Sequence, residues 1–81
     1  MRRVYLITES CWTRDAKFEY GVFLTKESAL AKAKELADVK AKNWERNSKK
    51  KAEVVQKGNE FWTYHDGSSN VYMVVESILY E

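Results

Sequence analysis

The sequence predicts an α+β domain in which a single antiparallel sheet of about five strands packs on one long helix. Three observations predict this: short segments with alternating apolar residues, one long apolar stripe at helical spacing, and two turn motifs near the C-terminus. With 81 residues, 44% of them hydrophobic, the chain is expected to form one domain, residues 1–81, with a modest core. The expected order of elements is β-β-α-β-β-β.

The first two strands are predicted at residues 2–10 and 18–24. The segment "RRVYLITES" is rich in β-branched and aromatic residues, which favour strands. In "FEYGVFL", the apolar residues Phe18, Tyr20 and Val22 occupy alternate positions, which is typical of a strand with one face more buried than the other. The intervening "CWTRDAK" is expected to be a polar connection.

A long helix is expected to start after Thr25, because a threonine hydroxyl can accept a hydrogen bond from an unpaired amide of the first turn. The residues that follow carry an apolar stripe at intervals of three and four. Its members are Ala29, Leu30, Ala33, Leu36, Ala37, Ala41 and Trp44. Because the stripe is mostly alanine, the helix is expected to lie close to the sheet, with Trp44 anchored in the core.

Three further strands are predicted after the helix. Gly58 and Asn59 lie between "AEVVQK" and "EFWTYH", where glycine supplies the positive φ that a type II′ hairpin turn requires. Residues 66–70, "DGSSN", are predicted to form a second turn, and "VYMVVESILYE" from Val71 is predicted to be the longest strand. The three strands would form a meander.

Three segments, "RRVYLIT", "YGVFLTKESALAKA" and "VYMVVESILYE", resemble small phage and bacterial proteins of a domain-of-unknown-function type. In such proteins a strand leads into a Gly-Val-Phe segment, a capped alanine-rich helix and a final strand. The resemblance implies this fold and an origin in a phage or mobile element. It implies no catalytic residue.

Charge is distributed unevenly along the chain. Residues 26–51 carry a balance of +5, whereas the rest carries −3. Basic residues at a helix C-terminus are favoured by the helix dipole, so a solvated helix end explains several of them. The alternative is a nucleic-acid-binding surface, which usually interleaves basic residues with aromatic ones. Its candidate residues are Lys40, Lys42, Arg46, Lys49, Lys50 and Lys51.

The sequence offers no catalytic constellation. His65 and Cys11 have no partner motif, and a hydrogen-bonded turn histidine is the commoner explanation of His65. Cys11 is interpreted as a partly buried thiol beside a packing or contact tryptophan, Trp12. The acidic residues are not at metal-ligand spacing, and the scattered glycines make no phosphate loop. We therefore expect no enzymatic activity, no metal, no cofactor and no small-molecule substrate.

The final strand is apolar on both sides, although one helix can cover only one face of a five-stranded sheet. Either sheet twist and the connection at residues 11–17 cover the second face, or it is a protein interface. The candidate interface residues are Trp12, Trp62, Tyr64, Tyr72 and Tyr80. The partner would be a second copy, giving a homodimer, or another protein.

The apolar second face favours a small non-enzymatic protein-binding module, and the resemblance to phage-type proteins implies one that inhibits or modulates a bacterial defence-type complex. The alternative is a nucleic-acid-binding accessory protein. The longest apolar run, Val71 to Val75, is far too short to span a membrane, and the N-terminus lacks the apolar stretch of a signal peptide. We therefore expect the protein in the cytoplasm, without a membrane partner.

Overall fold

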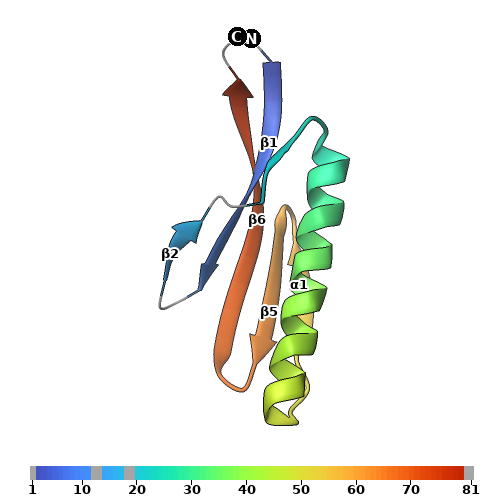
Figure 1. The fold of residues 1–81 in the computed structure, drawn as a ribbon, viewed down its shortest axis with the longest axis vertical. Coiled ribbons are helices and arrows are strands. Elements are labelled where there is room, and N and C mark those ends of the chain that lie inside the picture. The colour runs from blue at the N-terminus through green and yellow to red at the C-terminus, as the bar shows by residue number, and fades with distance from the viewer. Residues whose placement is uncertain (1, 12–13, 18–19, 80–81) are drawn as a thin grey trace.

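The computed structural model describes residues 2–11, 14–17 and 20–79, with side chains for 2–10 and 20–79. It is elongated, with extents of 47 × 23 × 19 Å, and α1 runs along one side of the sheet (Figure 1). The elements are β1 (Arg2–Cys11), β2 (Arg14–Lys17), β3 (Val22–Phe23), α1 (Lys26–Ser48), β4 (Glu53–Lys57), β5 (Glu60–His65) and β6 (Ser68–Leu79). In this described part of the chain, one helix packs on one antiparallel sheet, which confirms the predicted fold class.

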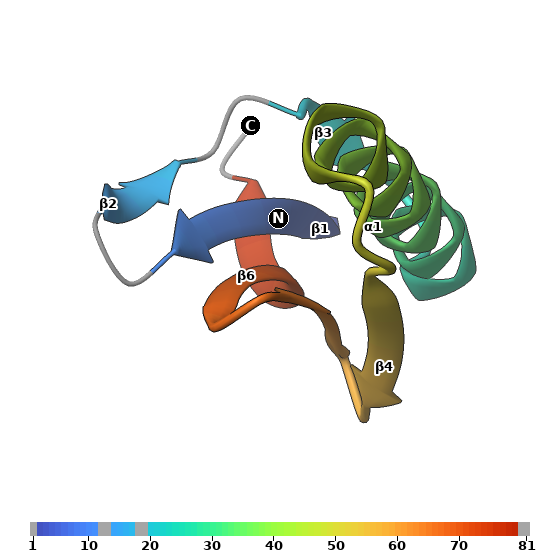
Figure 2. The same ribbon diagram turned by 90° about the horizontal axis from the view of Figure 1, so that it is seen from below.

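The sheet has the strand order β2-β1-β6-β5-β4, and all neighbouring strands are antiparallel. The first and last strands, β1 and β6, pair along their length, from Arg2 opposite Leu79 to Cys11 opposite Asn70. Since β6 occupies one edge of β1, both β2 and β3 pair on its other edge. Figure 2 shows that the sheet is strongly twisted, because the strand direction changes from β2 to β4.

The second predicted strand, residues 18–24, was wrong in its bounds. Residues 14–17, predicted to be a polar connection, instead form β2, and only Val22–Phe23 of the predicted strand pairs with β1. Gly21 lies between them with a φ of 88°, a left-handed conformation that interrupts an extended strand. Phe18 and Glu19 lie outside the described residues.

The helix begins as predicted. Thr25 is its N-cap, with extended backbone, and its Oγ1 accepts a hydrogen bond from the Ser28 amide at 3.1 Å. The helix ends at Ser48, and Lys49 follows in the left-handed conformation with a φ of 63°. The prediction for Trp44 needs correction, because this side chain is half-buried at the C-terminal end of α1 and does not belong to the buried core.

The core lies between α1 and one face of the sheet. Its buried members are Ile7, Ala29, Ala33, Ala37, Phe61, Tyr72 and Val74. Three of the stripe alanines are fully buried, so the helix approaches the strands closely enough for Thr63 to donate a hydrogen bond to the Ala37 carbonyl at 3.4 Å. The alanine stripe thus serves close packing, as the sequence predicts.

Two tight turns form the meander. Lys57 pairs with Glu60 across Gly58 and Asn59, and Gly58 has the predicted positive φ of 62°. The second turn contains only Asp66 and Gly67, both with positive φ, which is the conformation of a type I′ hairpin. Because this turn is shorter than predicted, β6 begins at Ser68 instead of Val71.

Candidate functional site

An aromatic pair, Trp62 and Tyr64, lies on the sheet face opposite α1. The two residues alternate along β5 with Phe61 and Thr63, which are buried toward the helix. Their rings are nearly parallel, with an interplanar angle of 8° and centroids 5.9 Å apart, and both side chains are half-buried. The Trp62 Nε1–H donates to Glu60 Oε1 at 2.8 Å, which fixes the indole orientation.

Lys57, the last residue of β4, lies over both rings of this pair from the neighbouring strand. Its Nζ lies 5.5 Å from the Trp62 ring centroid and 5.7 Å from that of Tyr64. It also donates to the Tyr64 hydroxyl at 3.2 Å. A cation within about 6 Å of an aromatic face is attracted to it, so Lys57 stabilises the parallel arrangement.

Apolar side chains surround the pair. The strand register places Val55 and Val71 on either side of Trp62, and Met73 opposite Glu60, all three half-buried. We call the surface formed by these residues the helix-free face; it consists of Val55, Trp62, Tyr64, Val71 and Met73. The helix α1 packs on the opposite face of the sheet. The helix-free face is therefore a partly exposed apolar surface with fixed aromatic rings.

The predicted grouping of Tyr72 with Trp62 and Tyr64 was wrong. Tyr72 stands opposite Phe61 in the register, so it faces α1 and is only 3% exposed. Its ring packs edge-on against Tyr20, with centroids 5.8 Å apart. The remaining candidates, Trp12 and Tyr80, lie outside the described residues. The structure thus brings together two of the five predicted interface residues.

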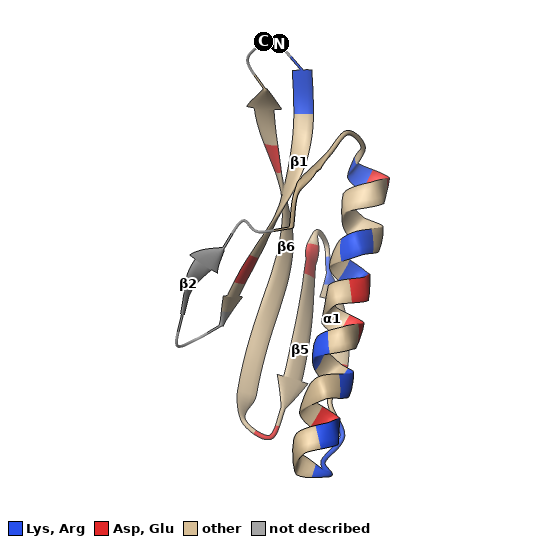
Figure 3. Ribbon diagram, in the orientation of Figure 1, with Lys and Arg blue, Asp and Glu red and all other residues tan. Residues whose placement is uncertain are grey.

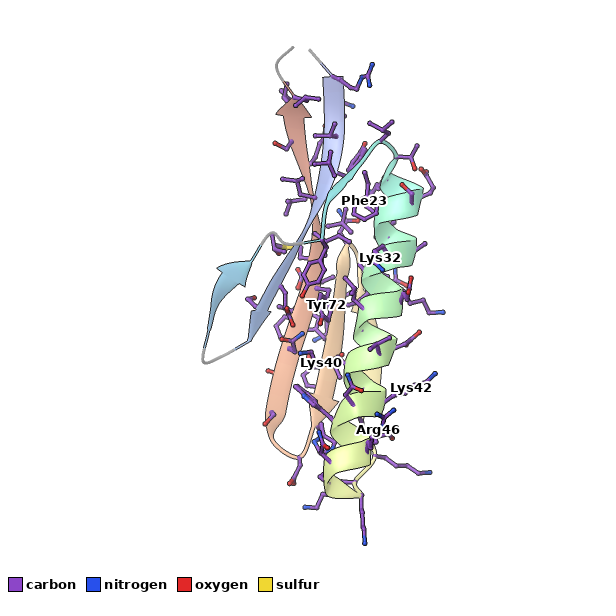
Figure 4. All side chains as sticks on the ribbon, in the orientation of Figure 1. Phe23, Lys32, Lys40, Lys42, Arg46 and Tyr72 are labelled. Carbon is purple, nitrogen blue, oxygen red and sulfur yellow. The ribbon has the colours of Figure 1, made fainter. Side chains whose placement is uncertain are left out.

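A polar network crosses the core boundary around the Glu9 carboxylate. It accepts hydrogen bonds from the hydroxyls of Tyr20 and Tyr72, the latter at 2.9 Å. Lys40 of α1 adds an ion pair at 3.3 Å, and the Glu9 side chain is only 12% exposed. Figure 4 shows Lys40 on the sheet side of the helix, with Tyr72 on the strand behind. One carboxylate therefore joins β1, β6 and α1.

The network shifts the ionisation of its members. Burial alone raises the pKa of Glu9, but the bonds from Tyr20 and Tyr72 and the charge of Lys40 outweigh it, and the net pKa is lowered. The pKa of Tyr72 is raised well above its ordinary value by burial and by the Glu9 carboxylate. The stable state at neutral pH is therefore an ionised Glu9 held by neutral tyrosines.

The predicted basic residues are divided by their contacts. Lys40 is engaged with Glu9, and Lys50 donates to Asp66 Oδ1 at 3.0 Å, which lowers the pKa of that aspartate. Lys50 is nevertheless exposed, and so are Lys42, Arg46, Lys49 and Lys51. Figure 3 shows basic residues at the helix C-terminal end, near the β5–β6 turn, with acidic residues among them. Five of the six predicted basic residues are therefore exposed, and Lys40 is the exception.

Two surface hollows adjoin this end of the molecule. One, of about 360 Å³, is lined by residues that include Lys51, Glu53, Tyr64 and Ser69. The other, of about 270 Å³, lies between the helix and the turn and is lined by Trp44, Asn47, Ser48, His65 and Ser68. His65 and Ser68 border both hollows. Aromatic side chains therefore stand next to the basic helix end, which the sequence reading had not placed there.

His65 ties the end of α1 to the β5–β6 turn. Its Nε2 lies 2.6 Å from Ser48 Oγ and 3.1 Å from the Lys50 carbonyl oxygen. A hydrogen bond to the Lys50 carbonyl requires the tautomer with the hydrogen on Nε2, because a carbonyl oxygen can only accept. Its ring also packs against Trp44, with centroids 5.7 Å apart. This confirms the interpretation of His65 as a hydrogen-bonded histidine.

Cys11 lies in β1 opposite Asn70, and its side chain is outside the described residues. Within the described part of the chain, no three His, Cys, Asp or Glu side chains gather closely enough to hold a metal ion. Of the same residues, the only long helix is far too polar to cross a membrane.

Sequence reasoning missed the roles of Glu9 and Lys57. An acidic residue in an apolar strand was a signal for the first, because a buried carboxylate needs partners.

Comparison with known proteins gave no match: no family model fits the sequence, and no curated protein or solved structure is significantly similar to it.

Proposed function

We propose that this chain is a small non-enzymatic protein-binding module that acts through its helix-free face. The observation that carries the proposal is the pair of Trp62 and Tyr64, held parallel and partly exposed among apolar neighbours. Rigid aromatic side chains dominate the binding energy of many protein interfaces, because they bury a large area at little cost in conformational entropy. The partner is a folded protein with a complementary apolar surface.

The concrete form of this proposal is an inhibitor or modulator of a bacterial defence-type complex, working in the cytoplasm of a bacterial host. Its support is the sequence resemblance to small phage and bacterial proteins. A binding module without a catalytic site fits such a role, since occupying a surface is enough to inhibit.

The test compares wild type with Trp62→Lys and with the control Val39→Lys, which changes an exposed apolar residue of α1 that is 50% exposed. Each protein is immobilised and exposed to bacterial lysate, and the affinity of any retained protein is then measured by calorimetry after purification. We expect Val39→Lys to bind as wild type does and Trp62→Lys to bind at least about tenfold more weakly. Equal binding by all three proteins, with folds verified by circular dichroism, would contradict the proposal.

A second candidate function is single-stranded nucleic-acid binding at the helix end. The observation that favours it is the position of Tyr64 in the same hollow as Lys51, next to a second hollow lined by Trp44, because bases stack on aromatic rings while lysines contact phosphates. Fluorescence anisotropy with a labelled single-stranded oligonucleotide tests it. Binding that weakens steeply between low and physiological salt, and that is lost in Lys51→Gln but kept in Lys34→Gln, would favour this function over protein binding.

A further inference from the structure

The outer edge of β4 is open. Among the described strands, β4 ends the sheet order and has β5 as its one neighbour. The opposite edge of the sheet is divided between β2 and β3, and both of these strands are shorter than β4. An open edge presents backbone N–H and C=O groups that pair readily with another strand.

The hairpin turn determines which backbone groups point outward. Lys57 and Glu60 close a two-residue turn, so their backbone groups bond to each other. By alternation, Val55 also bonds toward β5, whereas the N–H and C=O groups of Val54 and Gln56 point to the open edge.

A helix side chain closes the beginning of this edge. Ala52 lies two positions before Val54, so its amide points to the same side of the strand. This amide donates to Glu45 Oε2 at 3.0 Å. The stretch that remains available for pairing is therefore Val54 to Gln56, with one charged residue at each end. Glu53 and Lys57 are those two residues, and both are exposed.

The charges of β4 are self-complementary when two copies run antiparallel. If Val55 stands opposite Val55 of a second copy, Glu53 stands opposite Lys57 of that copy, and the reverse pair forms at the other end. The outward groups of Val54 then meet those of Gln56 in the second copy, which gives two hydrogen-bonded pairs. Opposite charges directly across an antiparallel ladder are stabilising, and like charges are destabilising.

We propose that β4 is a homodimer interface in which two copies pair antiparallel about Val55 and join their sheets into one. This dimer does not depend on the protein-binding function proposed above. It would place the two helix-free faces side by side, because Val55 is next to Trp62 in each copy. The two indoles would then lie about 14 Å apart, three strand spacings, on one continuous apolar surface.

The charge pattern allows a direct test by sedimentation velocity from low to high micromolar concentration. Glu53→Lys alone places lysine opposite lysine, and Lys57→Glu alone places glutamate opposite glutamate. Each change should raise the dimer dissociation constant by about 10- to 100-fold. A mixture of the two variants should restore the dimer as a heterodimer, because every cross-strand pair is again of opposite sign. The controls Glu35→Lys and Lys34→Glu change the same charges on the exposed side of α1 and should leave the dimer unchanged.

A second variant tests the backbone pairing itself. Gln56→Pro removes an outward N–H without removing a hydrogen bond to β5, and proline is tolerated at such edge positions. It should yield a folded monomer, as judged by its melting curve. A wild type that stays monomeric at high micromolar concentration would overturn the proposal, even if it bound another protein's strand at this edge. So would a dimer that both charge variants form as tightly as wild type, or a mixture that fails to associate.

Discussion

Replacing Glu9 with glutamine tests whether the polar network between β1, β6 and α1 stabilises the fold. The substitution preserves the size of the side chain and removes its charge. In the wild type, one carboxylate oxygen accepts from Tyr20 and the other from Tyr72, and Lys40 pairs with the latter oxygen at 3.3 Å. A glutamine has only one oxygen, so it can accept from one tyrosine while its amide group meets the other.

The expected loss follows from these contacts. A hydrogen bond to a charged group contributes about 1.5 to 3 kcal/mol to stability and a neutral one about 1 kcal/mol. The Lys40 side chain is 28% exposed, so its ion pair adds at most about 1 kcal/mol. We therefore expect Glu9→Gln to lower the free energy of unfolding by about 2 to 3 kcal/mol at neutral pH. That is a large part of the stability of a small domain.

The pH dependence gives the prediction its sign. The folded pKa of Glu9 is lowered from its ordinary value of 4.5, so the unfolded chain binds a proton more readily in acid. The stabilisation by Glu9 is thus complete above pH 4.5 and is lost as the pH falls through the lower folded value. Urea unfolding, followed by circular dichroism, should show a difference between wild type and Glu9→Gln at pH 7 that shrinks toward zero in acid.

The control for this experiment is Glu27→Gln, which removes an exposed carboxylate in the first turn of α1. We expect it to cost no more than about 1 kcal/mol. A difference between wild type and Glu9→Gln that stays constant from neutral to acid pH would refute the reasoning, because it would not follow the ionisation of Glu9. Equal stability at pH 7 would refute it as well.

Three further predictions concern the core and the helix end. Tyr72→Phe should lower the free energy of unfolding by about 1 to 2 kcal/mol. Because the pKa of Tyr72 is raised, wild type should lose stability more steeply than the variant as the pH rises past 10.0. Parallel alkaline unfolding curves for the two proteins would contradict this. Ala33→Leu should cost about 1 to 3 kcal/mol in urea unfolding, because Ala33 is fully buried between helix and sheet; an unchanged midpoint would show that the interface is loose. Lys49→Gly should raise the melting temperature and add about 0.5 to 1 kcal/mol to the free energy of unfolding, because glycine adopts the left-handed cap conformation without strain. A lower melting temperature would show that the lysine side chain supports the cap.

The sequence predicted those elements whose signal is local. The alanine stripe and the Thr25 cap located α1, and the glycine turns located the hairpins, because each depends on neighbouring residues. The second strand failed because an edge strand needs few apolar residues: β2 is the polar segment "RDAK". Its pairing with β1 is a non-local contact that no periodicity within the segment could reveal.

The site was predictable only in part, for the same reason. Alternation correctly placed Trp62 and Tyr64 on one face, since that depends on spacing alone. Which face Tyr72 shares with them depends on the register between β5 and β6, and the register was set by a turn of two residues instead of the predicted five. The contact of Lys40 with Glu9 depends on strand order, which the sequence left open. The contacts of Lys57 lie within the predicted hairpin, but they depend on the direction of its side chain, which alternation does not give.

Lys57 links the two surfaces that we propose. In this structure its ammonium group lies over the rings of Trp62 and Tyr64, where it partly shields the helix-free face. In the proposed β4 dimer, Glu53 of the second copy would stand opposite Lys57, so its carboxylate would compete with the two rings for the ammonium group. Lys57→Glu acts on both surfaces at once, and so does Glu53→Lys, because Glu53 stands opposite Tyr64. Gln56→Pro acts on the dimer alone, since Gln56 stands opposite Phe61 and lies outside the helix-free face. Loss of partner binding in Gln56→Pro would therefore show that the module binds as a dimer, and unchanged binding would show that one copy is enough.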